Sequence, residues 1–250
     1  MSKLRCLVVF AVLACSGCDS TGDRLEVPIP DQDRYVAMEL SCIHATSSKD
    51  VVVGGFLTDV DGGLEGIVLQ TTDAGKNWRR IGALTFPFEG FLPQTVYFND
   101  LLRGWVSGIR VRRGETIPSV IRTENGGGHW RESQIPENRA AIVVAASELL
   151  FESDEFGEVH VSYQDLATGL PRINLYETRD GGKNWVLGKF IDEVKPKISD
   201  TARFFITDQE GFRLEPPLPN GTQVLNFTGS AGEAWIPLCQ FHVSQFAQFY

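Results

Sequence analysis

The sequence has few of the residue patterns that bind metals or carry covalent catalysis. It contains neither a Gly-x-Ser-x-Gly nucleophile elbow nor a phosphate-binding loop. Four histidines occur in 250 residues and are too far apart for a zinc-ligand spacing: His44, His129, His160 and His242. Because a sustained helical period of apolar residues is also missing, we expect an all-β protein without a cofactor or a metal.

Positive charge is the next deficit. Lys and Arg number 23 against 32 Asp and Glu, which gives a net charge of −9. An acidic protein is repelled by the phosphates of nucleic acids and by anionic membrane surfaces, so we expect neither as an electrostatic partner. No segment reaches transmembrane length, and the apolar run at residues 7–14 is too short to span a bilayer core of about 30 Å.

That short apolar run has the features of a secretory signal. Lys3 and Arg5 precede it, and small residues and cysteines follow it. Residues 15–19, Cys-Ser-Gly-Cys-Asp, resemble a bacterial lipoprotein processing site, so we expect cleavage before Cys18 and acylation (palmitate) of its thiol. Cys15 is the alternative acylation site, and an ordinary cleaved signal without lipid is the alternative to both.

The expected parts of the chain are a signal peptide at 1–17, a polar tether at 18–35 and one domain at 36–250. Loss of the signal removes two basic residues and no acidic ones, so the net charge becomes −11. The lipid is expected to hold the mature protein on a bilayer of the bacterial cell envelope, facing the periplasm. The choice between inner and outer membrane stays open.

Four of the five tryptophans end one repeated eight-residue frame, Thr-x-(Asp/Asn/Ser)-x-Gly-x-x-Trp. The four copies, called boxes 1 to 4 below, span residues 71–78, 123–130, 178–185 and 228–235. The short polar side chain at position three can accept hydrogen bonds from turn N–H groups, and the glycine at position five allows a left-handed backbone. A β-rich run precedes each box, so each box predicts a β-hairpin whose returning strand begins at the Trp.

The frame resembles the Asp-box (BNR) repeat of β-propeller proteins, among them sialidases, sortilin-type receptors and photosystem II assembly factors. The resemblance covers about residues 36–240, and box 4 departs from it by having Ser230 in place of the acidic residue. It implies that each box joins the third and fourth strands of a blade. The third positions lie 52, 55 and 50 residues apart, which is the length of one blade. We therefore expect a small β-propeller of about four four-stranded blades.

The scarcity of cysteine makes two positions informative. Once the signal is removed and Cys18 is acylated, the remaining thiols are Cys42 and Cys239, at the two ends of the repeat array. An exported compartment permits disulfides, and a closed ring brings the ends of the array together, so we expect a Cys42–Cys239 disulfide. The alternatives are two buried reduced thiols, an open arc of blades, or a ring completed by a second copy.

Three arginines concentrate basic charge in the loop at residues 109–118: Arg110, Arg112 and Arg113. In a four-stranded blade this loop joins strands two and three, on the face opposite the boxes, where propellers commonly bind. We expect the three arginines to contact an acidic partner surface, and a solvated hairpin tip is the alternative.

The boxes also invite comparison with sialidases. Those enzymes need three arginines that grip a carboxylate, a Tyr–Glu nucleophile pair and an acidic proton donor, and they carry an Arg-Ile-Pro motif that this sequence lacks. We therefore expect a lipid-anchored, non-catalytic module that binds, assembles or neutralises an unknown envelope protein. The alternative is a carbohydrate-binding or sialidase-like glycan-processing protein.

Overall fold

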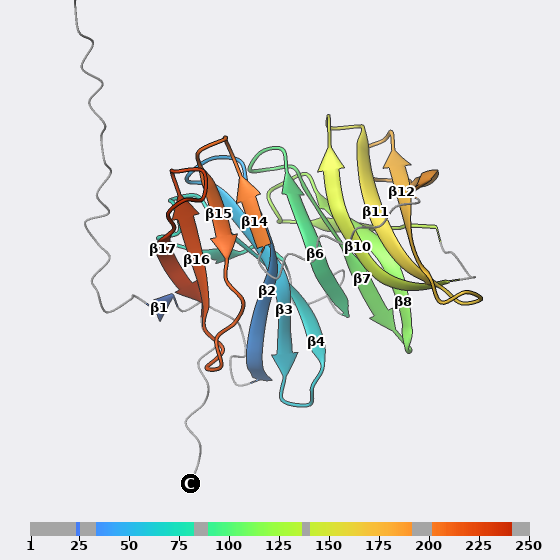
Figure 1. Cartoon of the computed structure of the whole chain (residues 1–250), viewed down its shortest axis with the longest axis horizontal. Coiled ribbons are helices and arrows are strands. Elements are labelled where there is room, and N and C mark those ends of the chain that lie inside the picture. Colours follow the sequence, from blue (N-terminus) through green and yellow to red (C-terminus); the bar gives the residue numbers. More distant parts are fainter. Residues whose placement is uncertain (1–23, 26–33, 83–89, 137–140, 192–201, 242–250) are drawn as a thin grey trace, which may run out of the picture.

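The computed structural model describes residues 24–25, 34–82, 90–136, 141–191 and 202–241, which form strands joined by turns (Figure 1). Its seventeen strands form four sheets. Consecutive strands of each sheet pair antiparallel. Within these ranges, no helix is long and apolar enough to cross a membrane. The expected all-β fold, a small β-propeller of four four-stranded blades, is confirmed.

Each sheet is one blade, numbered in sequence order. Blade 1 contains β2 (Tyr35–Ala45), β3 (Val51–Asp59), β4 (Leu64–Thr71) and β5 (Arg79–Arg80). Blade 2 contains β6 (Phe91–Phe98), β7 (Gly104–Arg112), β8 (Glu115–Thr123) and β9 (Trp130–Gln134). Blade 3 contains β10 (Ala141–Phe151), β11 (Gly157–Asp165), β12 (Pro171–Thr178) and β13 (Val186–Ile191). Blade 4 contains β14 (Ala202–Phe205), β15 (Gly211–Leu214), β16 (Gln223–Thr228) and β17 (Ile236–Phe241).

The blades pack face to face through apolar side chains that alternate along each strand. On β11, Val159, Val161 and Tyr163 are buried against blade 2, whereas the intervening His160 and Ser162 point to the other side and are partly exposed. Three buried clusters result, and they lie between blades 4 and 1, between blades 1 and 2, and between blades 2 and 3. The core is therefore a set of layers between successive blades.

These layers give the blades the spatial order 4, 1, 2, 3, with blades 4 and 3 at opposite ends of an arc (Figure 1). The first and last described strands of the chain pair in blade 4. Strand β1 (Arg24–Leu25), from the expected tether, pairs parallel with β17, and Arg24 lies opposite Gln240. The N-terminal strand thereby covers the outer edge of the last blade, an edge that would otherwise be open to further pairing.

All four boxes form the same turn between the third and fourth strands of a blade. The first-position Thr hydroxyl accepts the N–H of the fifth-position glycine at 2.9–3.1 Å. The third-position side chain accepts the N–H of the seventh residue at 2.8–3.0 Å. The fifth-position glycine has a positive φ, as the sequence predicts, but so has the fourth residue, which is alanine in boxes 1 and 4. Two successive left-handed residues make the turn tight enough for the Trp to fold back beneath it.

Candidate functional site

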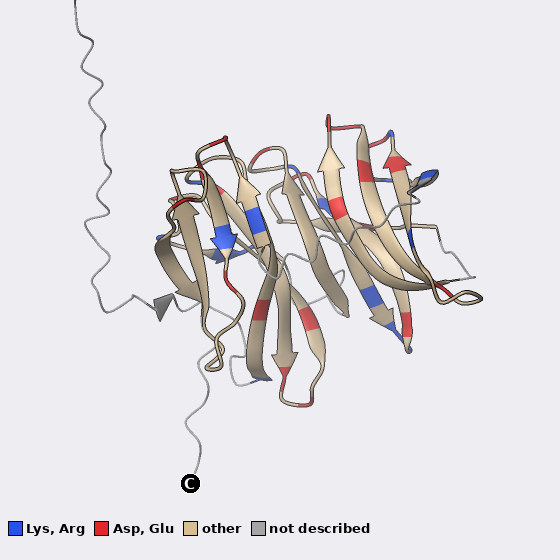
Figure 2. Ribbon diagram, in the orientation of Figure 1, with Lys and Arg blue, Asp and Glu red and all other residues tan. Residues whose placement is uncertain are grey.

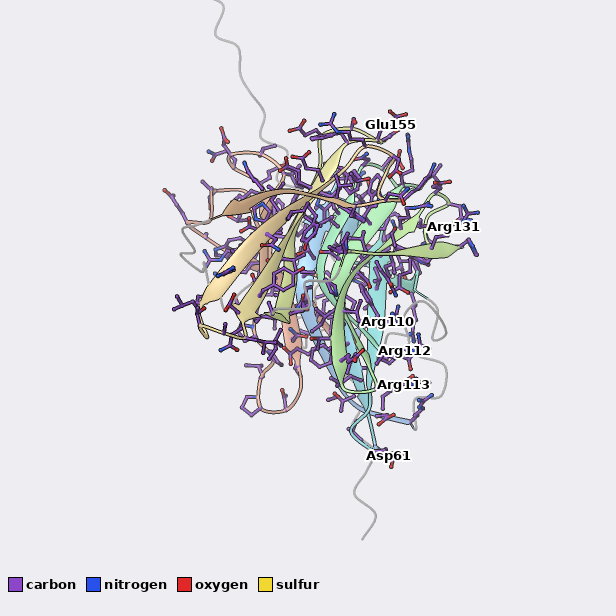
Figure 3. All side chains as sticks on the ribbon, turned by 90° about the vertical axis from the view of Figure 1, so that its right-hand side faces the viewer. Asp61, Arg110, Arg112, Arg113, Arg131 and Glu155 are labelled. Carbon is purple, nitrogen blue, oxygen red and sulfur yellow. The ribbon has the colours of Figure 1, made fainter. Side chains whose placement is uncertain are left out.

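A cleft of about 410 Å³ opens between blades 2 and 3, at the end of the molecule that carries the boxes. Boxes 2 and 3, the β6–β7 turn and the β10–β11 turn supply its walls. The lining residues are Arg103, Trp105, Arg122, Thr123, Glu124, Asp154, Glu155, Arg179, Asp180, Gly181 and Lys183. Figure 3 shows Glu155 at this end and Arg112, Arg113 and Asp61 at the opposite end.

Two hydrogen bonds, one from a side chain and one within the backbone, fix the walls of the cleft against each other. The indole N–H of Trp105 in blade 2 donates to the Gly181 carbonyl in box 3, at 2.9 Å. The Gly181 N–H in turn donates to the Glu155 carbonyl at 2.9 Å, which ties box 3 to the β10–β11 turn. The cleft is therefore held by the propeller scaffold, with its charged side chains mounted on short turns.

The arginines of the cleft differ in how fully they are paired. Arg103 forms ion pairs with Asp100, at 3.0 Å, and with Asp154. Arg122 donates from Nη1 to Glu124 at 3.2 Å, and its side chain is only 10% exposed. Its buried Nε has no hydrogen-bond partner among the described residues. An unpaired buried donor is costly, and because Nε is shielded from solvent, an anionic ligand could pair with it only after the guanidinium shifts toward the cleft.

The carboxylates also divide into structural and available groups. Asp180 is held by box 3: partial desolvation opposes ionisation, but hydrogen bonds from Asn184, Thr178 and Lys183 outweigh it and lower its pKa to about 2. Asp154 is bonded to Asn99 at 2.9 Å and to Arg103. Glu124, 66% exposed at its side chain, and the exposed Glu155 are thus the carboxylates best placed to meet a ligand.

Chemically, the cleft combines four cationic side chains with accessible carboxylates. Guanidinium groups bind carboxylate or phosphate groups, and glycoside hydrolysis is usually catalysed by a pair of carboxylates. Within the described ranges, no group of three or more His, Cys, Asp or Glu residues is arranged to hold a metal ion. Four cations and four carboxylates line the cleft, so the arrangement suits a polar ligand with an anionic group placed on a guanidinium.

The expected three-arginine surface is corrected at one position. Arg110 lies on β7, is buried, and donates from Nε to Glu132 at 2.7 Å, with both side chains 9% exposed. Its guanidinium also lies over the Phe91 ring, 5.6 Å from the centroid. β7 runs to Arg112, four residues into the loop predicted at 109–118, and so places Arg110 within the strand. Arg112 and Arg113 are exposed at the hairpin tip, and their contact with a partner stays a prediction.

The expected disulfide is also corrected, because Cys42 and Cys239 are separate reduced thiols. Cys42 belongs to the layer between blades 1 and 2, and burial raises its pKa to about 12. Cys239 belongs to the layer between blades 4 and 1. Cys42 therefore faces blade 2 from blade 1, and Cys239 faces blade 1 from blade 4, although blades 1 and 4 are neighbours. Cys18, the expected lipid site, lies outside the described residues, as do residues 1–17 and most of the tether.

Comparison with known proteins finds similarity to solved structures only. No protein family and no curated protein matches the chain. An α-L-arabinofuranosidase of Fusarium graminearum is 15% identical over 85% of this chain and 70% of its own, with a TM-score of 0.47. An α-L-arabinanase of Penicillium chrysogenum is 13% identical over 83% and 69%, with a TM-score of 0.47. A sialidase of Trypanosoma rangeli is 12% identical over 81% of this chain and 38% of its own, with a TM-score of 0.36. At these identities the likeness is one of fold.

These solved structures are glycoside hydrolases, and this finding runs against the function expected from the sequence. The prediction of a non-catalytic protein-binding or assembly module, and of a protein that is not an enzyme, is corrected accordingly.

Sequence reasoning did not single out the cleft residues. Arg122 and Glu124 flank the first residue of box 2, and Arg179 is the second residue of box 3. Charged residues at the unspecified positions of the boxes, and next to the boxes, could have indicated this site. The reason is that the box turns of neighbouring blades lie at the same end of the molecule. The sequence could not show which blades are neighbours at the cleft or which arginine lacks a partner.

Proposed function

We propose that the protein binds and processes acidic glycans in the cleft between blades 2 and 3. The observation that carries the proposal is the buried guanidinium of Arg122, whose Nε has no hydrogen-bond partner among the described residues. A sugar carboxylate could accept from Nε and a second guanidinium nitrogen, in the planar geometry that arginine favours, once the guanidinium shifts toward the cleft. Arg103, Arg179 and Lys183 add positive charge around the same cleft.

We further assign the two available carboxylates, Glu124 and Glu155, to glycosidic bond cleavage. One carboxylic acid protonates the leaving oxygen, and the other acts as base or nucleophile at the anomeric carbon. Arg122 holds one oxygen of Glu124 at 3.2 Å, so it orients that carboxylate while it binds the substrate. Arg122 in this scheme serves both recognition and positioning.

A screen of defined oligosaccharides tests the proposal. The mature chain is incubated with oligosaccharides that end in sialic acid or a uronic acid, and with neutral oligosaccharides of equal length. Release of sugar and binding by calorimetry are both measured. We expect activity on an acidic substrate, loss of binding in Arg122→Gln, and retained binding without turnover in Glu124→Gln or Glu155→Gln.

Glu233→Gln is the matched control, because Glu233 is exposed in the turn of box 4, away from the cleft. Binding without turnover would keep the carbohydrate-binding part and reject the enzymatic part. Acidic glycans that neither bind nor react would reject both, provided that thermal melting shows the protein folded.

The cellular setting is a second proposal, and it rests on the N-terminal sequence. We propose that the chain belongs to the Asp-box (BNR) repeat group, and that it is a lipoprotein acylated at Cys18 and held on the bacterial cell envelope facing the periplasm. The four identical box turns support the first part, and the apolar run before Cys-Ser-Gly-Cys supports the second. Cell fractionation of Cys18→Ser and Cys15→Ser tests the anchor, and release by Cys15→Ser alone would identify the other cysteine.

A further inference from the structure

Each of the first three box tryptophans packs against the blade that precedes it in the ring. Trp78 of blade 1 meets Phe241 of blade 4 edge to face, with ring centroids 5.1 Å apart. Trp130 of blade 2 donates from its indole nitrogen to the Ile81 carbonyl of blade 1, at 2.7 Å. Trp185 of blade 3 is buried in the layer shared with blade 2. The box Trp is thus a residue that packs each of these three blades against the previous blade.

Trp235 of blade 4 departs from this rule. Its expected neighbour is blade 3, which lies at the other end of the arc (Figure 1). The described contacts of its ring come from its own blade: Phe205 at 6.0 Å between centroids and the Arg213 guanidinium at 4.5 Å. Trp235 stays partly exposed, and Phe205 is 41% exposed. We call this face of blade 4 the Trp235 face. It carries aromatic side chains like those at the interfaces between blades, but no neighbouring blade packs against it among the described residues.

The matching face of blade 3 is exposed as well. Strand β10 buries Val143, Ala146 and Phe151 against blade 2. On its other side it exposes three large apolar side chains by about half: Ile142 at 50%, Val144 at 55% and Leu150 at 51%. Single exposed apolar residues are normal, but three on one side of one strand make a surface that a second protein could cover. We call this surface the β10 face.

Charged side chains of opposite sign lie on the two faces, although Arg213 already pairs with Glu215, Glu148 with His160 and Glu177 with Arg179. The Trp235 face has Arg203 and Arg213, which lie opposite each other on β14 and β15. The β10 face has Glu158 and Glu177, which lie opposite each other on β11 and β12, and the nearby Glu148. Figure 2 shows the basic bands on β14 and β15 at one end of the arc and acidic bands on β10, β11 and β12 at the other. Such complementarity fixes partner choice and register.

We propose that the β10 face of one copy docks on the Trp235 face of a second copy of this chain. Each copy then supplies the preceding blade that Trp235 of the other lacks. A two-fold axis relates the two copies, so the contact forms twice. The two four-blade arcs then close into one ring of eight blades, a number within the usual range of propellers. The proposal concerns assembly and is independent of the glycan site.

The experiment measures mass in solution and uses charge reversal to identify the faces. The mature chain, with Cys18→Ser to remove the lipid, is studied by light scattering and sedimentation over a concentration series. We expect twice the mass of one chain. Arg203→Glu and Glu158→Arg each place like charges across both contacts, so each is expected to weaken dimerisation about tenfold or more.

Mixing the two variants gives the decisive result. In the mixed dimer one contact has both charges reversed and the other is wild type, so dimerisation is expected to return. Both side chains lie on strand surfaces away from the buried layers, and circular dichroism melting checks that the variants fold. Arg112→Glu, at an exposed hairpin tip, is the control and should dimerise as the wild type does.

A wild-type chain that stays monomeric throughout the series overturns the proposal. If deletion of residues 242–250 then allows the dimer, the occupant of these faces is the chain's own C-terminal segment. A dimer that ignores both charge reversals also overturns it, because the contact then lies on another surface.

Discussion

The Nε2 of His44 donates a hydrogen bond to the Phe98 carbonyl, 2.9 Å away, and so joins β2 of blade 1 to β6 of blade 2. The same ring lies 4.7 Å from the Tyr97 ring and 4.4 Å from the Phe204 ring, between centroids. Three blades therefore meet at one imidazole. Burial lowers the pKa of His44 to about 4, although the Phe98 carbonyl favours the charged form.

This pKa predicts that acid loosens the junction of the three blades. In the unfolded chain a histidine has a pKa of about 6.5, so between about 6.5 and 4 the unfolded state binds the proton more tightly. The contribution of His44 is complete above pH ~6.5 and is lost as pH falls through ~4, by at most about 3 kcal/mol. Urea unfolding across this range should show less pH dependence in His44→Gln, whereas exposed His129→Gln should match the wild type. Equal slopes for wild type and His44→Gln would contradict this.

Two box tryptophans should respond differently to loss of the indole N–H. Trp130 donates to Ile81 in blade 1, but the buried Trp185 Nε1 has no hydrogen-bond partner among the described residues. Trp130→Phe leaves the Ile81 carbonyl unpaired and should cost about 1–3 kcal/mol more than Trp185→Phe. Both Trp→Ala variants should lose about 3–5 kcal/mol through a cavity. Denaturant unfolding measures the free energy of unfolding of all four variants. Equal losses for Trp130→Phe and Trp185→Phe would contradict a stabilising hydrogen bond from the Trp130 N–H.

Arg110 is expected to stabilise the fold. Arg110→Ser leaves the carboxylate of Glu132 buried without its ion-pair partner at 2.7 Å, which should cost about 3–5 kcal/mol. Arg112→Ser and Arg113→Ser, at the exposed tip of the same hairpin, should change stability by less than about 0.5 kcal/mol. A melting temperature for Arg110→Ser as high as that of its neighbours would show that the ion pair is dispensable.

The two buried thiols should be protected but not bonded to each other. Burial raises the pKa of Cys42 to about 12, so little of the reactive thiolate exists near neutral pH. Alkylation of the native protein should therefore be slow. Alkylation in denaturant without a reductant should label both Cys42 and Cys239, as read by mass spectrometry. A disulfide-linked pair of peptides containing Cys42 and Cys239 would contradict this prediction and support the disulfide expected from the sequence.

The boxes predicted much of the fold because they are local. Residues four apart, such as Asp180 and Asn184, contain all the information that the turn needs, and their spacing in sequence gave the blade length. The left-handed Ala74 and Ala231 were missed, because only glycine signals that backbone conformation in a sequence.

The sequence did not predict the features that depend on the side of a strand to which a residue points. Cys42 and Cys239 lie at the ends of the array, as ring closure suggests, yet one faces blade 2 and the other faces blade 1 from blade 4. Arg110 differs from Arg112 in pointing inward to Glu132, a residue on a separate strand. The cleft depends on the same information, because its arginines come from turns of two blades.

The contact between Trp78 and Phe241 has a consequence for biosynthesis. The chain emerges from the ribosome, and crosses a membrane if it is exported, from its N-terminal end. Blade 1 is therefore made first, but the residues that cover its Trp78 layer come from the last strand, more than 160 positions later. Until β17 arrives, an apolar surface of blade 1 remains open, and such exposed surface is prone to aggregate. The nascent chain thus has a period of vulnerability that ends only when its final blade returns to its first.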